Sequence, residues 1–310
     1  MNTLPIISLA AFDQPDHAPA EAQKLFDACK ECGFFYLQDH GVDPALIQRT
    51  MAASRTFFCL PEAVKGRYGH AVQTVYPPAS RGFIPMYGEI LHKEDGADAK
   101  ELFDLGFERP ASDKPFTGST VLPNEAVAPD FAYSQLALQE AIMGQVTPKL
   151  LHALARALGQ DPTYFDPYFV DPTLIQRVIH YPGSYSSAGR HTDTGIFTVL
   201  IQEQTVAPSL HVYSQGAWIP APYIEGTFVI NLGDMLQYWT DGLFVSTPHQ
   251  VTHRAASSRV SMPFFVFPNI DTVFTSLASG KKVSVQEVML KNFESIWVAG
   301  TGSGRAQELN

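Results

Sequence analysis

The second half of the chain is a series of short β-rich runs, and this pattern limits the folds that the chain can adopt. From Pro172 onward, runs rich in Val, Ile, Leu, Phe and Tyr are separated by Gly, Pro and Asn. This spacing is typical of an antiparallel sandwich or barrel, in which each strand buries one face against another sheet. We expect strands at 175–181, 196–202, 210–213, 227–232, 236–238, 243–245 and 259–266.

The first half has the periodicity of helices. A helix is predicted at 20–32, where Gly33 can end it, and a second at 44–59, with Asp43 as its N-cap and Pro44 at its first position. Apolar residues recur every fourth position up to Leu158, which predicts a long helix at 132–158 that Pro148 should kink. We expect short strands at 4–9 and 34–37, long loops with short strands at 67–127 and a final helix at 284–297.

Together these patterns predict an α+β fold with a mainly β core in one compact unit. Its regions would be a helical and loop-rich segment at 1–125, and a long helix followed by the β core at 126–310. The net charge of −10, without a cluster of Lys and Arg, argues against partners such as nucleic acid or an anionic membrane. No stretch is apolar enough to span a membrane, and residues 1–10 do not resemble a signal peptide. Three cysteines are too few to stabilise a chain of 310 residues by disulfide bonds, so we expect a reducing compartment. We therefore expect a cytoplasmic enzyme that acts on a small molecule, as a monomer or weak homo-oligomer.

The densest chemical signal is the run from Arg190 to Gly195. His191 and Asp193 are two residues apart, which puts both side chains on the same face of an extended strand. An imidazole and a carboxylate on one face are two metal ligands, and a third must come from elsewhere. His249 and His253 are the candidates, and we favour His249 because His253 begins a polar stretch typical of a hairpin tip. Two histidines and one carboxylate suit non-haem Fe(II) that activates O₂, and the lack of a thiolate disfavours structural zinc.

The order of several motifs resembles the Fe(II)/2-oxoglutarate-dependent oxygenases of the isopenicillin N synthase type. This resemblance covers nearly the whole chain and implies a double-stranded β-helix, or jelly roll, flanked by helices, with iron on His191, Asp193 and His249. The matching segments are GFFYLQDHGV at 33–42, Arg81-Gly82-Phe83, His191-x-Asp193, VINLGDMLQ at 229–237, Ser246-x-x-His249-x-Val251 and Arg259-x-Ser261.

The resemblance also implies a cosubstrate site. In this family the far carboxylate of 2-oxoglutarate meets the Arg and Ser of the R-x-S motif, here Arg259 and Ser261, and Tyr181 matches a tyrosine that helps to bind it. The physics agrees, because a buried dicarboxylate needs a fixed cation and Arg offers a planar, permanently charged fork. Plant relatives have Asn two residues before this tyrosine, whereas this chain has Ile179, which removes one polar contact.

The implied reaction couples decarboxylation of 2-oxoglutarate, to succinate and CO₂, to hydroxylation of an unactivated C–H bond; some relatives instead desaturate or cyclise. The implied cofactors are Fe(II), 2-oxoglutarate and O₂, with ascorbate as a further candidate. Candidate substrate contacts come from the loop-rich segment and from the faces of two strands. They are Arg81, Phe83, Tyr87, Glu89, Phe103, Arg177 and Phe265.

Two other reactions stay open on this sequence. One is oxidation by Fe(II) without 2-oxoglutarate, as in isopenicillin N synthase or the ascorbate-using aminocyclopropane carboxylate oxidase. Both relatives keep R-x-S, so Arg259 and Ser261 do not exclude them. The other is ethylene formation, because residues 243–249 resemble the bacterial ethylene-forming enzyme, although that enzyme lacks the serine of R-x-S.

Overall fold

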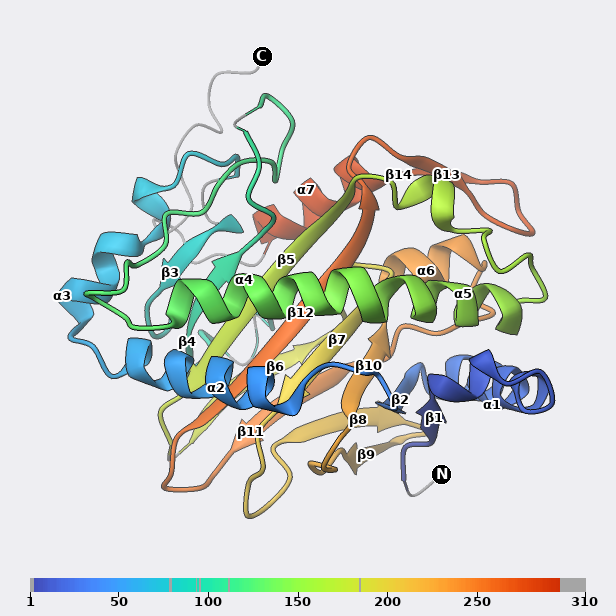
Figure 1. Ribbon diagram of the computed structural model, residues 1–310, viewed down its shortest axis with the longest axis horizontal. Helices are drawn as coiled ribbons and strands as arrows, with labels where there is room; N and C mark the ends of the chain where they lie inside the picture. The colour runs from blue at the N-terminus through green and yellow to red at the C-terminus, as the bar shows by residue number, and fades with distance from the viewer. Residues whose placement is uncertain are drawn as a thin grey trace.

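Two stacked β-sheets form the centre of the molecule. The structure is a computed structural model that describes residues 3–77, 80–92, 94, 96–110, 112–183 and 185–295. The large sheet has the order β1-β2-β10-β7-β12-β5-β4-β3 and the small sheet the order β6-β11-β8-β9. Apart from the parallel pair β1–β2, the paired strands are antiparallel. This is the predicted jelly roll, formed by two facing sheets and not by a closed barrel (Figure 1).

The strands are mostly short. Those of the large sheet are β1 (Ile6–Ser8), β2 (Phe34–Gln38), β3 (Gly82–Ile84), β4 (Glu101–Leu105), β5 (Pro172–Tyr181), β7 (Phe197–Gln202), β10 (Phe228–Leu232) and β12 (Arg259–Asn269). Those of the small sheet are β6 (Ser186–His191), β8 (Leu210–Ser214), β9 (Ala217–Pro220) and β11 (His249–His253), and a separate hairpin pairs β13 (Val273–Thr275) with β14 (Lys282–Ser284).

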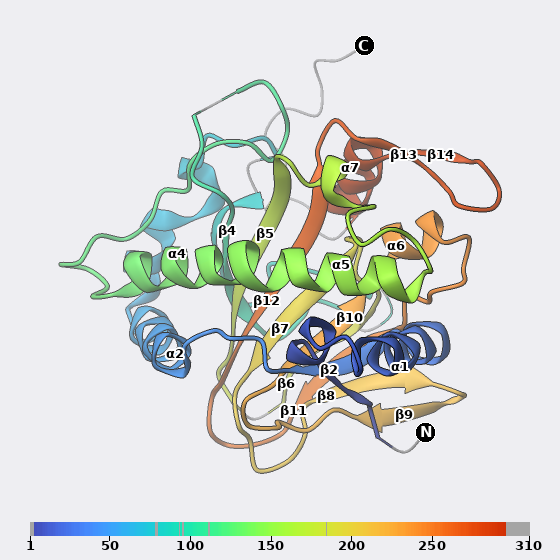
Figure 2. The same ribbon diagram turned by 45° about the vertical axis from the view of Figure 1, so that its right-hand side comes forward.

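Helices cover the outer face of the large sheet, with the α4–α5 rod lying across it above α2 and α1 (Figures 1 and 2). The α-helices are α1 (Ala18–Glu31), α2 (Pro44–Phe58), α3 (Glu62–Lys65), α4 (Phe131–Ala141), α5 (Thr147–Ala157), α6 (Asp234–Trp239) and α7 (Val285–Ser295). Short 3₁₀ turns are η1 (Ala10–Asp13), η2 (Gly66–Tyr68), η3 (His70–Val72) and η6 (Asp166–Tyr168), and η5 (Ile142–Val146) is a π-helical turn. In the described part of the chain, none of the helices combines the length and the apolar character needed to cross a membrane.

Alternation along the central strands separates an outer core from the space between the sheets. On β12, Val260, Met262 and Phe264 join the outer core, which the large sheet shares with the helices. The intervening residues, among them Arg259 and Ser261, line a cavity between the sheets. The strand period of two therefore places Arg259 and Ser261 on the cavity face of β12 and a continuous apolar surface on the other face.

Most predicted elements are present, but several segments differ from the prediction. Asp43 caps α2 as expected, by accepting a hydrogen bond from Ala45 N at 2.9 Å. The expected kink at Pro148 takes the form of the π-helical turn η5, immediately before α5. The strand predicted at 236–238 is wrong, because helix α6 is formed there, and 243–245 is a loop. Strands β6, β9, β11, β13 and β14 were not predicted, and the end of the helix predicted at 284–297 lies outside the described residues.

The predicted regions 1–125 and 126–310 contribute to one sheet. Strands β1 to β4 come from the first region, and within the sheet β2 pairs with β10 and β4 pairs with β5 of the second region. The position of the boundary at 125 stays a prediction.

Candidate active site

A cavity of about 330 Å³ lies between the two sheets. Strands β5, β7, β10 and β12 of the large sheet form one wall, and β6, β8 and β11 of the small sheet form the opposite wall. Helix α7 adds Met289, Asn292 and Phe293, and Phe116 comes from the long loop after β4. The cavity therefore collects side chains from distant parts of the sequence.

Two histidines and one aspartate meet in this cavity. His191 ends β6 and is paired directly with His249, the first residue of β11. Oδ1 of Asp193 lies 3.8 Å from Nε2 of His191 and 3.7 Å from Nε2 of His249. One ligand atom from each of the three residues lies within 4.8 Å of the other two, a spacing that one metal ion can bridge. The structure thus brings together the three residues that the sequence nominated as ligands.

Backbone hydrogen bonds orient both imidazoles. Nδ1 of His191 donates to Gly189 O at 2.7 Å, and Nδ1 of His249 donates to Thr247 O at 3.2 Å. Because a carbonyl oxygen can only accept, Nδ1 carries the proton and Nε2 keeps its lone pair for a ligand. Burial, and then the neighbouring His249, lower the pKa of His191 to about 3. That imidazole is therefore neutral, as a metal ligand must be.

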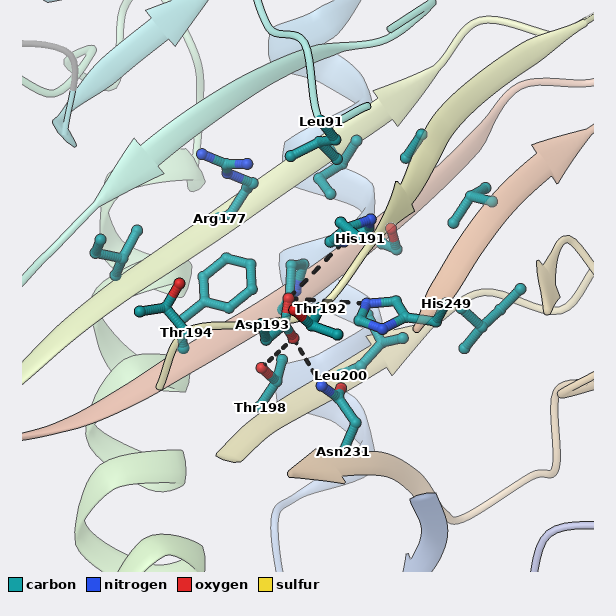
Figure 3. A pocket seen from close by; sticks show the side chains of 18 of the residues that line it. Leu91, Arg177, His191, Thr192, Asp193, Thr194, Thr198, Leu200, Asn231 and His249 are labelled. Carbon is teal, nitrogen blue, oxygen red and sulfur yellow. Dashed lines mark hydrogen bonds and ion pairs between the residues drawn. The ribbon is translucent and has the colours of Figure 1, made fainter. Parts of the chain in front are cut away.

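Asp193 is held by side chains of the large sheet (Figure 3). Its Oδ2 accepts hydrogen bonds from Thr198 Oγ1 at 2.5 Å and from Asn231 Nδ2 at 2.7 Å, which leaves Oδ1 turned toward the histidines. Burial raises the pKa of Asp193, but the two imidazoles and these hydrogen bonds together hold it below its ordinary value. Asn231 therefore has a structural role, as a hydrogen-bond donor to the carboxylate.

The strand argument for Asp193 is wrong in one respect. β6 ends at His191, so Asp193 lies in the following loop and not on the same strand face. The loop is fixed by α6, whose Asp234 N donates to Asp193 O at 2.7 Å. A Cβ at Gly233 would lie 2.2 Å from Gly195 O, so only glycine permits this close approach. The Gly233-Asp234 segment therefore positions the carboxylate.

Arg259 is a buried cation without a carboxylate partner. It is 1% exposed, its Nη1 lies 3.3 Å from Ser261 Oγ, and its guanidinium is 5.1 Å from the ring centroid of Tyr181. Glu203, the carboxylate whose charge acts on Arg259, is paired with Arg55 instead. Burial lowers the pKa of Arg259, and the described residues form no ion pair with it. An anion bound beside Arg259 would relieve this unfavourable burial.

Arg177, unlike Arg259, is paired with carboxylates. Nε and Nη2 donate to the two oxygens of Asp104, each at 2.8 Å, and Nη1 donates to Glu89 Oε1 at 2.8 Å. Lys100 extends the network, because its Nζ lies 2.7 Å from Glu89 and 2.8 Å from Asp98. Arg177 and Lys100 both line the cavity, whereas the three carboxylates that pair with them do not.

The other predicted substrate contacts lie at varied places. Phe265 lines the cavity and packs under Arg177, with 5.7 Å between its ring centroid and the guanidinium. Arg81 is buried and donates to Ser80 O and Phe116 O. Phe103 packs in the outer core against Phe57 and Phe131. None of Arg81, Phe83, Tyr87, Glu89 and Phe103 lines the cavity, and Tyr87 is 58% exposed.

His253, the alternative ligand, lies elsewhere. Its Nδ1 bonds to Ser209 Oγ at 3.0 Å and its Nε2 to Ser257 O at 2.7 Å, so both ring nitrogens are engaged away from Asp193. It is buried, although the sequence predicted a position at a hairpin tip. Its side chain packs near Tyr181 and does not join the histidine–aspartate cluster.

Several cavity residues were not identified from the sequence. Thr198 lies inside an apolar strand, and Lys100 lies in a loop without periodicity, so neither position carried a signal. Phe116, Met289 and Phe293 belong to segments whose path over the cavity is set by tertiary packing. The sequence motifs therefore identify the residues of the reacting centre, but not the other residues that line the cavity.

The residues present fit the group that the donor set implies. Two imidazole nitrogens and one carboxylate oxygen within a few ångströms match the ligands of a non-haem Fe(II) site. The unpaired Arg259 in the same cavity matches the far end of a dicarboxylate ligand.

Comparisons with known proteins agree with this site. Residues 4–126 match the family model of the N-terminal region of non-haem dioxygenases in morphine synthesis, and residues 172–268 match that of the 2OG-Fe(II) oxygenase superfamily. A Dictyostelium discoideum protein named "probable iron/ascorbate oxidoreductase" is 31% identical, over 88% of this chain and 84% of its own length. A 2-oxoglutarate-dependent dioxygenase of Aspergillus niger is 30% identical, over 84% of this chain and 83% of its own length.

The fold is also found in solved structures. A Neurospora crassa protein, crystallised with α-ketoglutarate and thymine, has a TM-score of 0.82 over 94% of this chain and 96% of its own, at 23% identity. By its sequence matches and by its fold, the chain belongs to the 2OG-Fe(II) oxygenase superfamily, as an Fe(II)/2-oxoglutarate-dependent dioxygenase of the isopenicillin N synthase-like type.

Proposed function

We propose that this enzyme hydroxylates a C–H bond of a small molecule, using Fe(II) on His191, Asp193 and His249 and 2-oxoglutarate anchored at Arg259. The observation that carries the proposal is that the ligand cluster and a buried, unpaired guanidinium line the same cavity. Fe(II) with 2-oxoglutarate and O₂ supplies an oxidant for unactivated C–H bonds, and leaves succinate and CO₂.

The chain's own residues prepare the site for this chemistry. The Gly189 and Thr247 carbonyls fix the two imidazoles with Nε2 free, and Thr198 and Asn231 fix the carboxylate. Arg259, with Ser261 and Tyr181 beside it, would bind the far carboxylate of 2-oxoglutarate. The two sheets bury Asp193, His249 and Arg259 and leave His191 half-buried, which limits the access of water to the reacting centre.

The size of the cavity supports a small substrate. About 330 Å³ is near the lower end of the range for ligand pockets, and 2-oxoglutarate must share it. The Neurospora protein, which was crystallised with the small ring compound thymine, has the same fold. We therefore place the substrate in the part of the cavity lined by Arg177 and Phe265.

An anaerobic visible difference spectrum tests the site. Fe(II) and then 2-oxoglutarate are added to the wild type, to Arg259→Ala and to the control Arg156→Ala, which removes an exposed arginine of α5. We expect a metal-to-ligand charge-transfer band in the wild type and the control, and a much weaker band in Arg259→Ala at the same 2-oxoglutarate concentration. Fe(II) binding without any band would refute the cosubstrate assignment.

The same preparation tests the ascorbate alternative. Succinate released in air is measured with 2-oxoglutarate alone, ascorbate alone and both together. We expect ascorbate to increase turnover only when 2-oxoglutarate is present. Oxygen consumption with ascorbate alone would favour an ascorbate-using oxidase instead.

We also propose that the enzyme works in the cytoplasm as a monomer or weak homo-oligomer. Support comes from the free thiols, since Cys29, Cys32 and Cys59 form no disulfide in the described structure. Size-exclusion chromatography with light scattering over a range of concentrations tests the oligomeric state. A stable tetramer or larger assembly would contradict it.

A further inference from the structure

Arg177 and Lys100 give one part of the cavity wall an unusual polarity. Both cations line the cavity, and the three carboxylates that neutralise them, Glu89, Asp98 and Asp104, do not. All five side chains are buried. The cavity therefore presents N–H donors at this place, while the compensating negative charge lies behind them.

Donor capacity remains after these ion pairs form. A guanidinium has five N–H groups and an ammonium has three. Asp104 and Glu89 use three of the donors of Arg177, and Glu89 and Asp98 each approach Nζ of Lys100. A substrate oxygen that accepts a hydrogen bond could use the remaining N–H groups without displacing a carboxylate.

Rings and aliphatic side chains line the rest of this part of the cavity. Phe265 lies under Arg177, and Phe116 packs edge-on against Phe293, with 5.5 Å between ring centroids. Leu91 lies on the same side of the metal-ligand cluster as Arg177 (Figure 3). The chamber thus combines an apolar, ring-lined volume with a donor-rich patch of two cations that pair with three buried carboxylates.

We propose that the substrate is an uncharged, largely apolar ring compound whose carbonyl or amide oxygen accepts hydrogen bonds from Arg177 and Lys100. This proposal rests on the proposed function, because it assigns the substrate end of the same cavity. A substrate carboxylate would add a fourth negative charge to a network that has three carboxylates and two cations. A substrate cation would face the two cations directly.

Matched probes separate the three charge classes. Benzamide, benzoate and benzylamine are titrated under argon into the complex of wild-type enzyme with Fe(II) and 2-oxoglutarate. Binding is measured by calorimetry and by the change in the charge-transfer band. We expect benzamide to bind at least about tenfold more tightly than benzoate or benzylamine, because buried charge mismatches are expensive. Equal or tighter binding of either charged probe, or no binding of benzamide, would overturn the proposal.

Removing one of the carboxylates that pair with Arg177 and Lys100 should weaken the preference for the uncharged probe. In Glu89→Gln the cation pair loses one compensating carboxylate, so the benzoate-to-benzamide affinity ratio should rise by roughly tenfold to a hundredfold. Asp104→Asn is the second variant if Glu89→Gln does not fold, and Asp161→Asn is the control, because this exposed aspartate bonds only within its own turn. A ratio that changes no more than in Asp161→Asn would refute the electrostatic basis.

The failure of this proposal is distinguishable from the failure of the proposed function. If the charge-transfer band forms with 2-oxoglutarate but the probe preferences are reversed, the cosubstrate site stands and the substrate class is wrong. If the band does not form, the cosubstrate assignment itself is wrong.

Discussion

Two buried arginines on neighbouring strands of one cavity have opposite surroundings. Arg259 on β12 is paired directly with Tyr181 on β5, and Arg177 lies four residues away on β5, roughly 13 Å at about 3.3 Å per residue. Arg177 has two carboxylates within bonding distance, whereas Arg259 has none among the described residues. A neutralised cation can hold structure and donate hydrogen bonds, but only an unneutralised one gains much from binding an anion.

The first prediction is that Arg177, and not Arg259, stabilises the fold. Arg177→Met would leave Asp104 buried without its ion-pair partner and Glu89 paired with Lys100 alone, at a cost of about 3–5 kcal/mol in the free energy of unfolding. For a chain of 310 residues the melting temperature should therefore fall by roughly 5–8 °C. Thermal unfolding followed by circular dichroism measures this, with Arg156→Met as a surface control that should change stability by less than about 0.5 kcal/mol. A loss no larger than in the control would show that the network contributes little.

The second prediction is that Arg259 contributes to 2-oxoglutarate binding and not to the stability of the fold. Arg259→Met removes a buried charge that has no acidic partner, so the free energy of unfolding should fall by less than about 1 kcal/mol or rise. The dissociation constant of 2-oxoglutarate should increase by roughly thirtyfold to several thousandfold, which corresponds to about 2–5 kcal/mol. Anaerobic titration of the charge-transfer band measures the affinity.

Arg259→Lys sharpens this result. It keeps the charge but loses the planar fork, so its 2-oxoglutarate affinity should lie between those of the wild type and Arg259→Met. If all three proteins bind 2-oxoglutarate equally, the anchor lies elsewhere.

The difference between the two arginines shows how far sequence can lead. Arg259 lies in an R-x-S motif on a predicted strand, so both its orientation and its role were predictable. The partners of Arg177 lie on β4 and in the loop before it, where no periodicity marks them, and their pairing depends on tertiary packing. The sequence therefore indicated the strand that carries Arg259 and the metal ligands, but not the carboxylates that pair with Arg177.

The local errors have a similar physical origin. The segment 236–238 has a short apolar run that fits a buried strand as well as a helical turn. The turn is formed because Gly233 allows a close approach to the loop that contains Asp193. Asp193 itself follows the strand, so its convergence with His191 comes from a loop that α6 fixes, and not from strand alternation.

The third prediction concerns pH and tests whether Glu89 belongs to the neutralised network. Burial opposes its charge, but Arg177 and Lys100 lower the pKa of Glu89 to about 2. A lowered folded-state pKa stabilises the protein above the unfolded-state pKa, near 4.3, and this stabilisation is lost as pH falls toward 2. The difference in unfolding free energy between wild type and Glu89→Gln should therefore be constant from neutral pH to about 5.

Below about pH 4.5 that difference should shrink by up to about 1.4 kcal/mol per pH unit. Urea denaturation at a series of pH values down to the acid transition measures it. A second comparison in the Arg177→Met background should reduce the slope, because only Lys100 then remains to lower the pKa of Glu89. A difference that stays constant below about pH 4.5 would contradict the ion-pair origin.

The smallest predicted effect connects the neutralised network to the metal site. Oδ1 of Asp98 accepts a hydrogen bond from Gly189 N at 2.7 Å, and Gly189 O accepts one from Nδ1 of His191 at 2.7 Å. The same carboxylate bonds Lys100, so one residue joins the charge network to the peptide that orients a ligand. Groups that orient metal ligands in this way typically affect metal affinity by roughly 10- to 100-fold.

Asp98→Ala should therefore weaken Fe(II) binding by roughly tenfold, near the low end of that range, because the Gly189 carbonyl itself remains. Asp98→Asn keeps an acceptor for Gly189 N and should restore most of the affinity, while Asp161→Asn should leave it unchanged. Competition between Fe(II) and a chromophoric chelator measures the three values. If Asp98→Asn is as weak as Asp98→Ala, the charge on Asp98 matters more than the hydrogen bond to Gly189, and the neutralised network would then act on the metal through its field and not through the orientation of His191.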